Sequence, residues 1–197
     1  MRNVIICTLA LLGLSLSACA PDLHMQQPIA FGLIQSGNAP TAVQELSSAL
    51  SIHDKELVPA LETVKVEEKR NPYMNFGDLS WGVMAKAIGD AFRANDRMKL
   101  ALDKANTAFA ALMQDSSRRE TAESGMALVK EMKIYSFLVS QMLRDMDAYH
   151  RSLPFQEAIL TQLNSENEDS FNKTAEQIGK SMKRITDTRN AFAKTTH

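Results

Sequence analysis

The residues best suited to metal binding are Met142, Met146 and His150, which follow one another at intervals of four. On a helix these side chains would share one face. Thioether and imidazole groups are soft ligands that suit copper, above all Cu(I). Methionine is also a common filler of irregular gaps in helical cores. We therefore expect packing to be the main role of the two methionines, and the three residues are only weak metal candidates.

Asp147 and His150 have the spacing of an acid–histidine pair, which di-metal carboxylate sites use on two of their four helices. Such a site needs a second pair, and the remaining histidines, His24, His53 and His197, do not supply it. The sequence also contains no glycine-rich phosphate loop, no HExxH pattern and no CxxCH haem motif. We therefore expect no enzymatic activity and no bound cofactor.

The chain starts with a basic residue, Arg2, and an apolar run over Val4–Leu14. This run is shorter than the roughly 20 residues that a membrane-spanning helix needs. It ends in the small residues Ser17 and Ala18, directly before Cys19. A charged start, a short apolar stretch and small residues at a cleavage point are typical of a secretory signal peptide.

The residues Leu16-Ser17-Ala18-Cys19 resemble the lipobox of bacterial lipoproteins, in which an aliphatic and two small residues precede a cysteine. The resemblance implies that residues 1–18 are removed and that Cys19 carries diacylglycerol and a further acyl chain such as palmitate. Several acyl chains anchor a protein stably to a membrane. Because Ala20 and not aspartate follows, the resemblance implies the outer membrane, with the protein facing the periplasm or, alternatively, the cell surface. An ordinary signal peptide is the competing interpretation.

Composition excludes some classes of function. The chain has 22 basic and 23 acidic residues and a formal net charge of −1, so we expect no nucleic-acid binding. Of its two cysteines, Cys7 lies in the signal and Cys19 would carry lipid. We therefore expect no disulfide, although the periplasm is oxidising.

Residues 19–40 are predicted to form a lipidated, flexible tether, because Pro21, Pro28 and Pro40 resist regular structure. Fully extended, the tether could span about 70 Å. One part of it is apolar and could dock on the folded domain, lie at the lipid surface or insert into a partner. The apolar residues of that part are Ile29, Phe31, Leu33 and Ile34.

Apolar residues that recur every three and four positions predict long helices in the rest of the chain. The first covers 41–69, and Pro59 should kink it or split it, with Asp54 capping the second piece. The second covers 78–114 and carries an unbroken coiled-coil seam, in which Asn95 is the polar member. A polar residue in such a seam often sets helix register.

The third predicted helix starts with a capping box of Ser117 and Glu120 and ends near Leu153, before Pro154. The last one covers 155–194. Polar, turn-forming residues at 164–170 should divide that helix or soften its middle. The fold class predicted for residues 41–197 is therefore all-α, an elongated antiparallel bundle of about four helices.

Three aromatic residues lie close together between the first two predicted helices: Tyr73, Phe76 and Trp81. They could plug the end of the bundle or anchor a partner. Our functional hypothesis is a membrane-anchored interaction or structural lipoprotein. It would dock on a protein of a cell-envelope assembly of the secretion, pilus or efflux type. The alternative is a helical bundle that binds a small molecule or a metal, such as copper or haem.

Overall fold

The computed structural model describes residues 39–70, 79–152 and 160–195, and the described chain is entirely helical. Its elements are α2 (Ala39–Ile52), the π-helical turn η2 (His53–Leu57), α3 (Val58–Arg70), α4 (Leu79–Leu112), α5 (Arg119–Ser152) and α6 (Leu160–Thr195). Side chains are described for 41–70, 82–148 and 172–195. None of the described helices has an apolar stretch long enough to cross a membrane. The predicted tether lies outside the described residues up to residue 38, but its predicted end at residue 40 is wrong, because Ala39 and Pro40 form the first turn of α2, where a proline needs no N–H. The aromatic residues Tyr73 and Phe76 and the side chain of Trp81 also lie outside the description.

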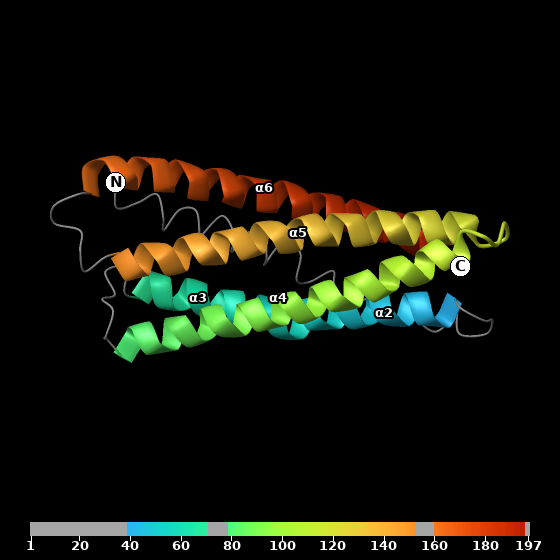
Figure 1. Cartoon of the computed structure of the whole chain (residues 1–197), viewed down its shortest axis with the longest axis horizontal. Coiled ribbons are helices and arrows are strands. Elements are labelled where there is room, and N and C mark those ends of the chain that lie inside the picture. The colour runs from blue at the N-terminus through green and yellow to red at the C-terminus, as the bar shows by residue number, and fades with distance from the viewer. Residues whose placement is uncertain (1–38, 71–78, 153–159, 196–197) are drawn as a thin grey trace.

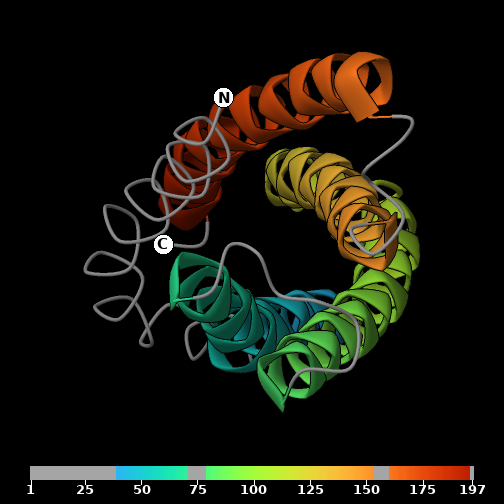
Figure 2. The same ribbon diagram turned by 90° about the vertical axis from the view of Figure 1, so that its left-hand side faces the viewer.

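The helices lie side by side along one long axis, and their closest packing follows their order in the chain (Figure 1). The unit α2–η2–α3 packs on α4, α4 packs on α5, and α5 packs on α6. Seen along the axis, the four layers follow an arc (Figure 2). The predicted all-α fold with four packed helical segments is confirmed.

The core follows the predicted seam of α4. The residues of this seam whose side chains are described are all buried: Met84, Ile88, Ala91, Asn95, Met98, Leu102, Ala105, Phe109 and Leu112. A repeat of three and four keeps such residues on one face of a helix of 3.6 residues per turn. Helix α5 lies between α4 and α6, and it therefore has only a narrow exposed strip.

The first helix bends through a π turn and does not break. The backbone N–H of Val58 bonds to the carbonyl of His53, five residues earlier. Pro59 has no N–H to donate, and its ring would clash with the carbonyl four residues before it in a regular helix. The wider turn relieves this clash, which confirms the predicted kink. The predicted cap is wrong, because Asp54 lies within the π turn and accepts a hydrogen bond from His53 Nδ1 at 2.7 Å.

The turn between α4 and α5 is organised by Asp115. The backbone N–H and the hydroxyl of Ser117 donate to Asp115 Oδ1 at 3.0 and 2.6 Å. These bonds lower the pKa of the Asp115 carboxyl below its usual value. The predicted capping box of Ser117 and Glu120 is therefore wrong, because the serine hydroxyl serves the turn and α5 begins only at Arg119.

Helix α6 is continuous from Leu160, so the predicted division at 164–170 is wrong, and the alternative of one helix with a softer middle stays a prediction. That stretch contains neither proline nor glycine. Serine, asparagine and aspartate lower helix propensity by fractions of 1 kcal/mol each, too little to stop a long packed helix. The predicted start of this helix at residue 155 lies outside the described residues.

A glycine allows α5 to approach α4 near their connecting turn. A Cβ atom added at Gly125 would lie 2.5 Å from two ring atoms of Phe109. The Phe109 ring is fully buried and meets the ring of Phe192 from α6 edge to face, with centroids 5.7 Å apart. Phe109 thus joins three helices at one level of the bundle.

We expect Gly125→Ala to destabilise the protein. Phe109 cannot move away from the new methyl group without disturbing Phe192, and overpacking of this kind costs about 1–3 kcal/mol. The helix-propensity gain of about 1 kcal/mol offsets only part of this loss. Urea unfolding followed by circular dichroism measures the difference.

The matched control is Gly179→Ala in α6, where the new Cβ would meet no atom within 4 Å. That variant should be as stable as the parent protein, or more stable by up to about 1 kcal/mol. If both variants gained stability equally, the contact between Gly125 and Phe109 would not limit how closely the helices pack.

Candidate functional site

An open groove of about 690 Å³ runs along the seam between α4 and α5. One residue of α4 and one face of α5 line it: Asn106, Glu123, Met126, Ala127, Lys130, Lys133, Ile134 and Phe137. The α5 residues recur every three or four positions, so they form the exposed strip of that helix. The groove surface is mainly apolar, with charged groups at intervals along it.

Two large apolar residues of α4 and α5 are unusually exposed: Phe137 lines this groove, and Leu100 lies on the outward face of α4. Phe137 on α5 is 60% exposed and Leu100 on α4 is 63% exposed. Contacts of Lys99 with Ser140 and of Asp103 with Lys133 bracket them on both helices. Leu100 and Phe137 therefore lie at the same level of the antiparallel pair. We call Leu100, Met126, Ile134 and Phe137 together the α4–α5 patch.

Two of the three lysines around the patch form ion pairs with described residues. Lys133 forms an ion pair with Asp103 at 2.6 Å, and Lys99 forms one with Asp96 at 3.3 Å. Lys130 is exposed and makes no ion pair within the described part of the chain. Within the described part of the chain, the groove therefore presents an apolar surface on which the Lys130 ammonium has no ion-pair partner.

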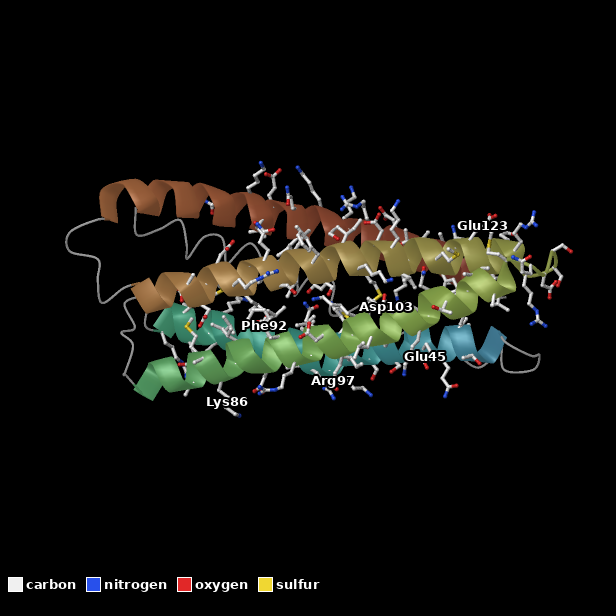
Figure 3. All side chains as sticks on the ribbon, in the orientation of Figure 1. Glu45, Lys86, Phe92, Arg97, Asp103 and Glu123 are labelled. Carbon is white, nitrogen blue, oxygen red and sulfur yellow. The ribbon has the colours of Figure 1, made fainter. Side chains whose placement is uncertain are left out.

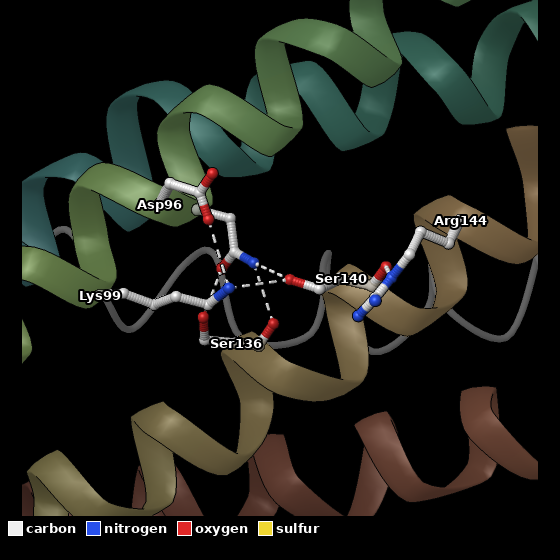
Figure 4. A network of polar contacts seen from close by, with 6 residues as sticks. Asp96, Lys99, Ser136, Ser140 and Arg144 are labelled. Atoms are coloured by element: carbon white, nitrogen blue, oxygen red, sulfur yellow. Dashed lines mark hydrogen bonds and ion pairs between the residues drawn. The ribbon is translucent and has the colours of Figure 1, made fainter.

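A buried polar network fixes α4 against α5 at the same level (Figure 4). Asn95 Nδ2 donates to the Ser136 carbonyl at 2.9 Å and to Ser140 Oγ at 2.7 Å. In return, Ser136 Oγ donates to Asn95 Oδ1 at 2.7 Å. All three residues are buried, and the side-chain amide of Asn95 is bonded at both ends. The predicted polar member of the seam thus links two helices of the same chain.

The network also brings a lysine beside a serine, a pairing that some hydrolases use for nucleophilic attack. Lys99 Nζ donates to Ser140 Oγ at 3.1 Å and to Asp96 Oδ1 at 3.3 Å (Figure 4). A lysine that donates to a carboxylate as an ammonium ion has no lone pair for the serine proton. Ser140 is also buried between the helices. The contact is therefore a structural link between α4 and α5.

A second polar cluster lies inside the arc, where α6 approaches η2. The ring of His53 meets the ring of Tyr135 edge to face, with centroids 5.3 Å apart. Arg189 Nη1 of α6 is buried and has no hydrogen-bond partner among the described residues. Burial lowers the pKa of Arg189, and the charge of Asp54 opposes this effect. The cluster shows how the C-terminal half of α6 is placed over the π turn.

Only some of the predicted site residues have described side chains. Met142 and Met146 are buried in the core, which fits a packing role. The side chain of His150, which the metal hypothesis needs, lies outside the described side chains, as do Cys19, Ile29, Phe31, Leu33, Ile34, Tyr73, Phe76 and Trp81. Within the described residues, no group of three or more histidine, cysteine or acidic side chains could hold a metal ion.

The apolar stripes that predict the helices do not reveal the α4–α5 patch, because they mark only the face of each helix that turns to the core. Phe137 precedes the core residue Leu138, so the run of apolar residues in α5 is wider than one face requires. Leu100 likewise lies between two seam residues, Met98 and Leu102. Apolar residues outside the core stripe were the available signal.

We expect Asn95→Ala to lower the free energy of unfolding by about 2–3 kcal/mol, because Ser136 and Ser140 would lose buried hydrogen-bond partners. Urea unfolding measures the loss. In a Ser136→Ala, Ser140→Ala background the same substitution should cost clearly less, since both serine hydroxyls are then gone and only the bond from Asn95 Nδ2 to the backbone carbonyl of residue 136 remains to be lost. Equal losses in both backgrounds would contradict a coupled network.

Among the described residues, the α4–α5 patch is thus an exposed apolar surface on two helices whose register a buried network fixes, with charged groups beside it. Comparison of the chain with models of protein families, with curated protein sequences and with solved structures finds no match.

Proposed function

We propose that this protein is a lipid-anchored interaction protein that faces the periplasm and docks on a protein of the cell envelope through the α4–α5 patch. The exposure of Phe137 and Leu100 at one level of the bundle carries this proposal. Exposed apolar residues that cluster beside a groove are typical of binding sites, and large side chains of this kind often supply most of the binding energy.

The shape of the bundle supports docking along one face. Helices α4 and α5 each have 34 residues, so each is a rod of about 50 Å. The patch lies on their paired surface, whose register the Asn95 network fixes. A rigid surface loses little conformational entropy on binding, so more of the contact energy remains as affinity.

The lipobox-like residues Leu16–Cys19 indicate where the protein is held in the cell. Lipid on Cys19 would keep the bundle within the reach of residues 20–38, about 65 Å when fully extended. The partner must therefore lie at or near the same membrane, as components of secretion, pilus and efflux assemblies do. Lys130 would meet a carboxylate of that partner at the groove.

The docking surface is tested with a photo-crosslinking amino acid in place of Phe137 in intact cells. We expect a discrete crosslinked protein, because this side chain is exposed in the middle of the patch. The control position is Lys180, which is exposed on α6 and does not line the groove, and it should give no such product. The proposal fails if probes at Phe137, Leu100 and Lys130 all give only the uncrosslinked chain.

The lipid anchor is tested with Cys19→Ser. We expect labelled palmitate to be incorporated into the parent protein and not into this variant, because the thiol is the acceptor. Equal labelling of both proteins would overturn the assignment of the anchor.

A further inference from the structure

We infer that the apolar tether segment Ile29–Ile34 covers the α4–α5 patch when no partner is bound. The tether and an external partner would then compete for one surface. This inference rests on the proposed function, because it concerns the regulation of the same patch. Four observations support it: the place where α2 begins, the length of the intervening chain, the neutrality of the segment and the fit of its spacing.

The described chain begins close to the groove. Thr41 and Glu45 of α2 share a shallow depression with Asp103, Thr107 and Ala111 of α4. Asn106, from the same turns of α4, lines the groove on its other side. Figure 3 shows Glu45, Asp103 and Glu123 towards the same end of the bundle. Only α4, about 10–12 Å across with its side chains, separates the start of α2 from the groove.

The chain before α2 is long enough to cross this distance. Five residues connect Ile34 to Ala39 and could span about 17 Å, and eight residues connect Phe31 to Ala39 and could span about 27 Å. The segment could therefore lie along the groove while α2 keeps its place on α4. Residues 20–28 would remain to reach the lipid on Cys19.

The chemistry of the segment matches an apolar surface. Residues 25–44 contain no charged side chain. Within them, the large apolar residues Ile29, Phe31 and Leu33 alternate with the small residues Ala30 and Gly32. In an extended conformation these three side chains lie on one side over about 13 Å. Along α5, Met126 and Ile134 are about 12 Å apart in axial rise. An apolar segment can thus fill the groove and leave Lys130 in water, whereas an external partner could also use that cation.

Attachment to the same chain makes a weak contact sufficient. A short flexible linker gives its two ends an effective concentration in the millimolar range. Docking would also shorten the free part of the tether, because only about ten residues, spanning about 35 Å, would remain between Cys19 and the docked segment. Release by a partner would roughly double the distance that the bundle can move from the membrane.

The inference is tested by disulfide formation in the chain from residue 19 onwards, with Cys19→Ser so that only introduced cysteines are present. Ala30→Cys with Ala127→Cys places one thiol in the segment and one in the groove without removing an apolar anchor. We expect more than about half of this variant to form an intramolecular disulfide under mild oxidation, given the high effective concentration. The control pairs Ala30→Cys with Lys180→Cys on α6 and should form at least about fivefold less.

A second measurement follows the rate at which a maleimide labels Ala127→Cys alone. Adding Phe31→Asp and Leu33→Asp should raise this rate several-fold, because two carboxylates cannot be buried in an apolar groove. The control adds the same charges outside the apolar run, as Gln26→Asp and Ser36→Asp, and should leave the rate unchanged. Equal disulfide yields for both cysteine pairs, or equal labelling rates for all chains, would overturn the inference.

These outcomes are separable from those for the proposed function. A crosslinked partner at Phe137 without the disulfide would leave the docking function standing and remove tether docking. The disulfide without any crosslinked partner would leave tether docking standing and remove the docking function. The two results can be told apart on a gel, because a crosslink within the chain adds no mass.

Discussion

The buried amide of Asn95 constrains the rest of this structure. Among the seam residues of α4 whose side chains are described, Asn95 alone carries a polar group, and it bonds to Ser136 and Ser140 of α5. Sliding α5 by one turn would leave these groups in apolar surroundings at a cost of several kcal/mol. The amide therefore selects a single register from the several that an apolar seam alone would allow.

The contacts that make the exposed patch follow from that register. Lys133 reaches Asp103 and Lys99 reaches Ser140 only because the two helices are aligned at Asn95. The same alignment places Gly125 against Phe109, and Phe109 in turn meets Phe192 of α6. One buried network thus sets the level of Leu100 and Phe137 on the outer face, and indirectly the place of α6.

Local patterns predicted the parts of the fold that depend on local chemistry. The seam of α4 and the bend at Pro59 follow from apolar periodicity and from a missing N–H, and both were predicted. The cap at Asp54, the capping box at Ser117 and the division of α6 into two helices were wrong. The two capping side chains bond to other partners, and packing keeps α6 continuous. Asp54 bonds to His53, and Ser117 bonds to Asp115. The patch could not be located because exposure depends on which helices become neighbours.

Phe137 is the residue for which the fold offers no internal role. Its neighbours in sequence, Ser136 and Leu138, are both buried, but Phe137 lies on the side of α5 opposite the core, because successive residues of a helix point about 100° apart. The hydrogen bonds of Ser136 and Ser140 to Asn95 fix this rotation of α5 about its axis. The network therefore holds an apolar ring in water at a solvation cost of about 1–2 kcal/mol. Covering the ring, by a partner or by the chain's own tether, recovers that free energy without any change in the register of the bundle.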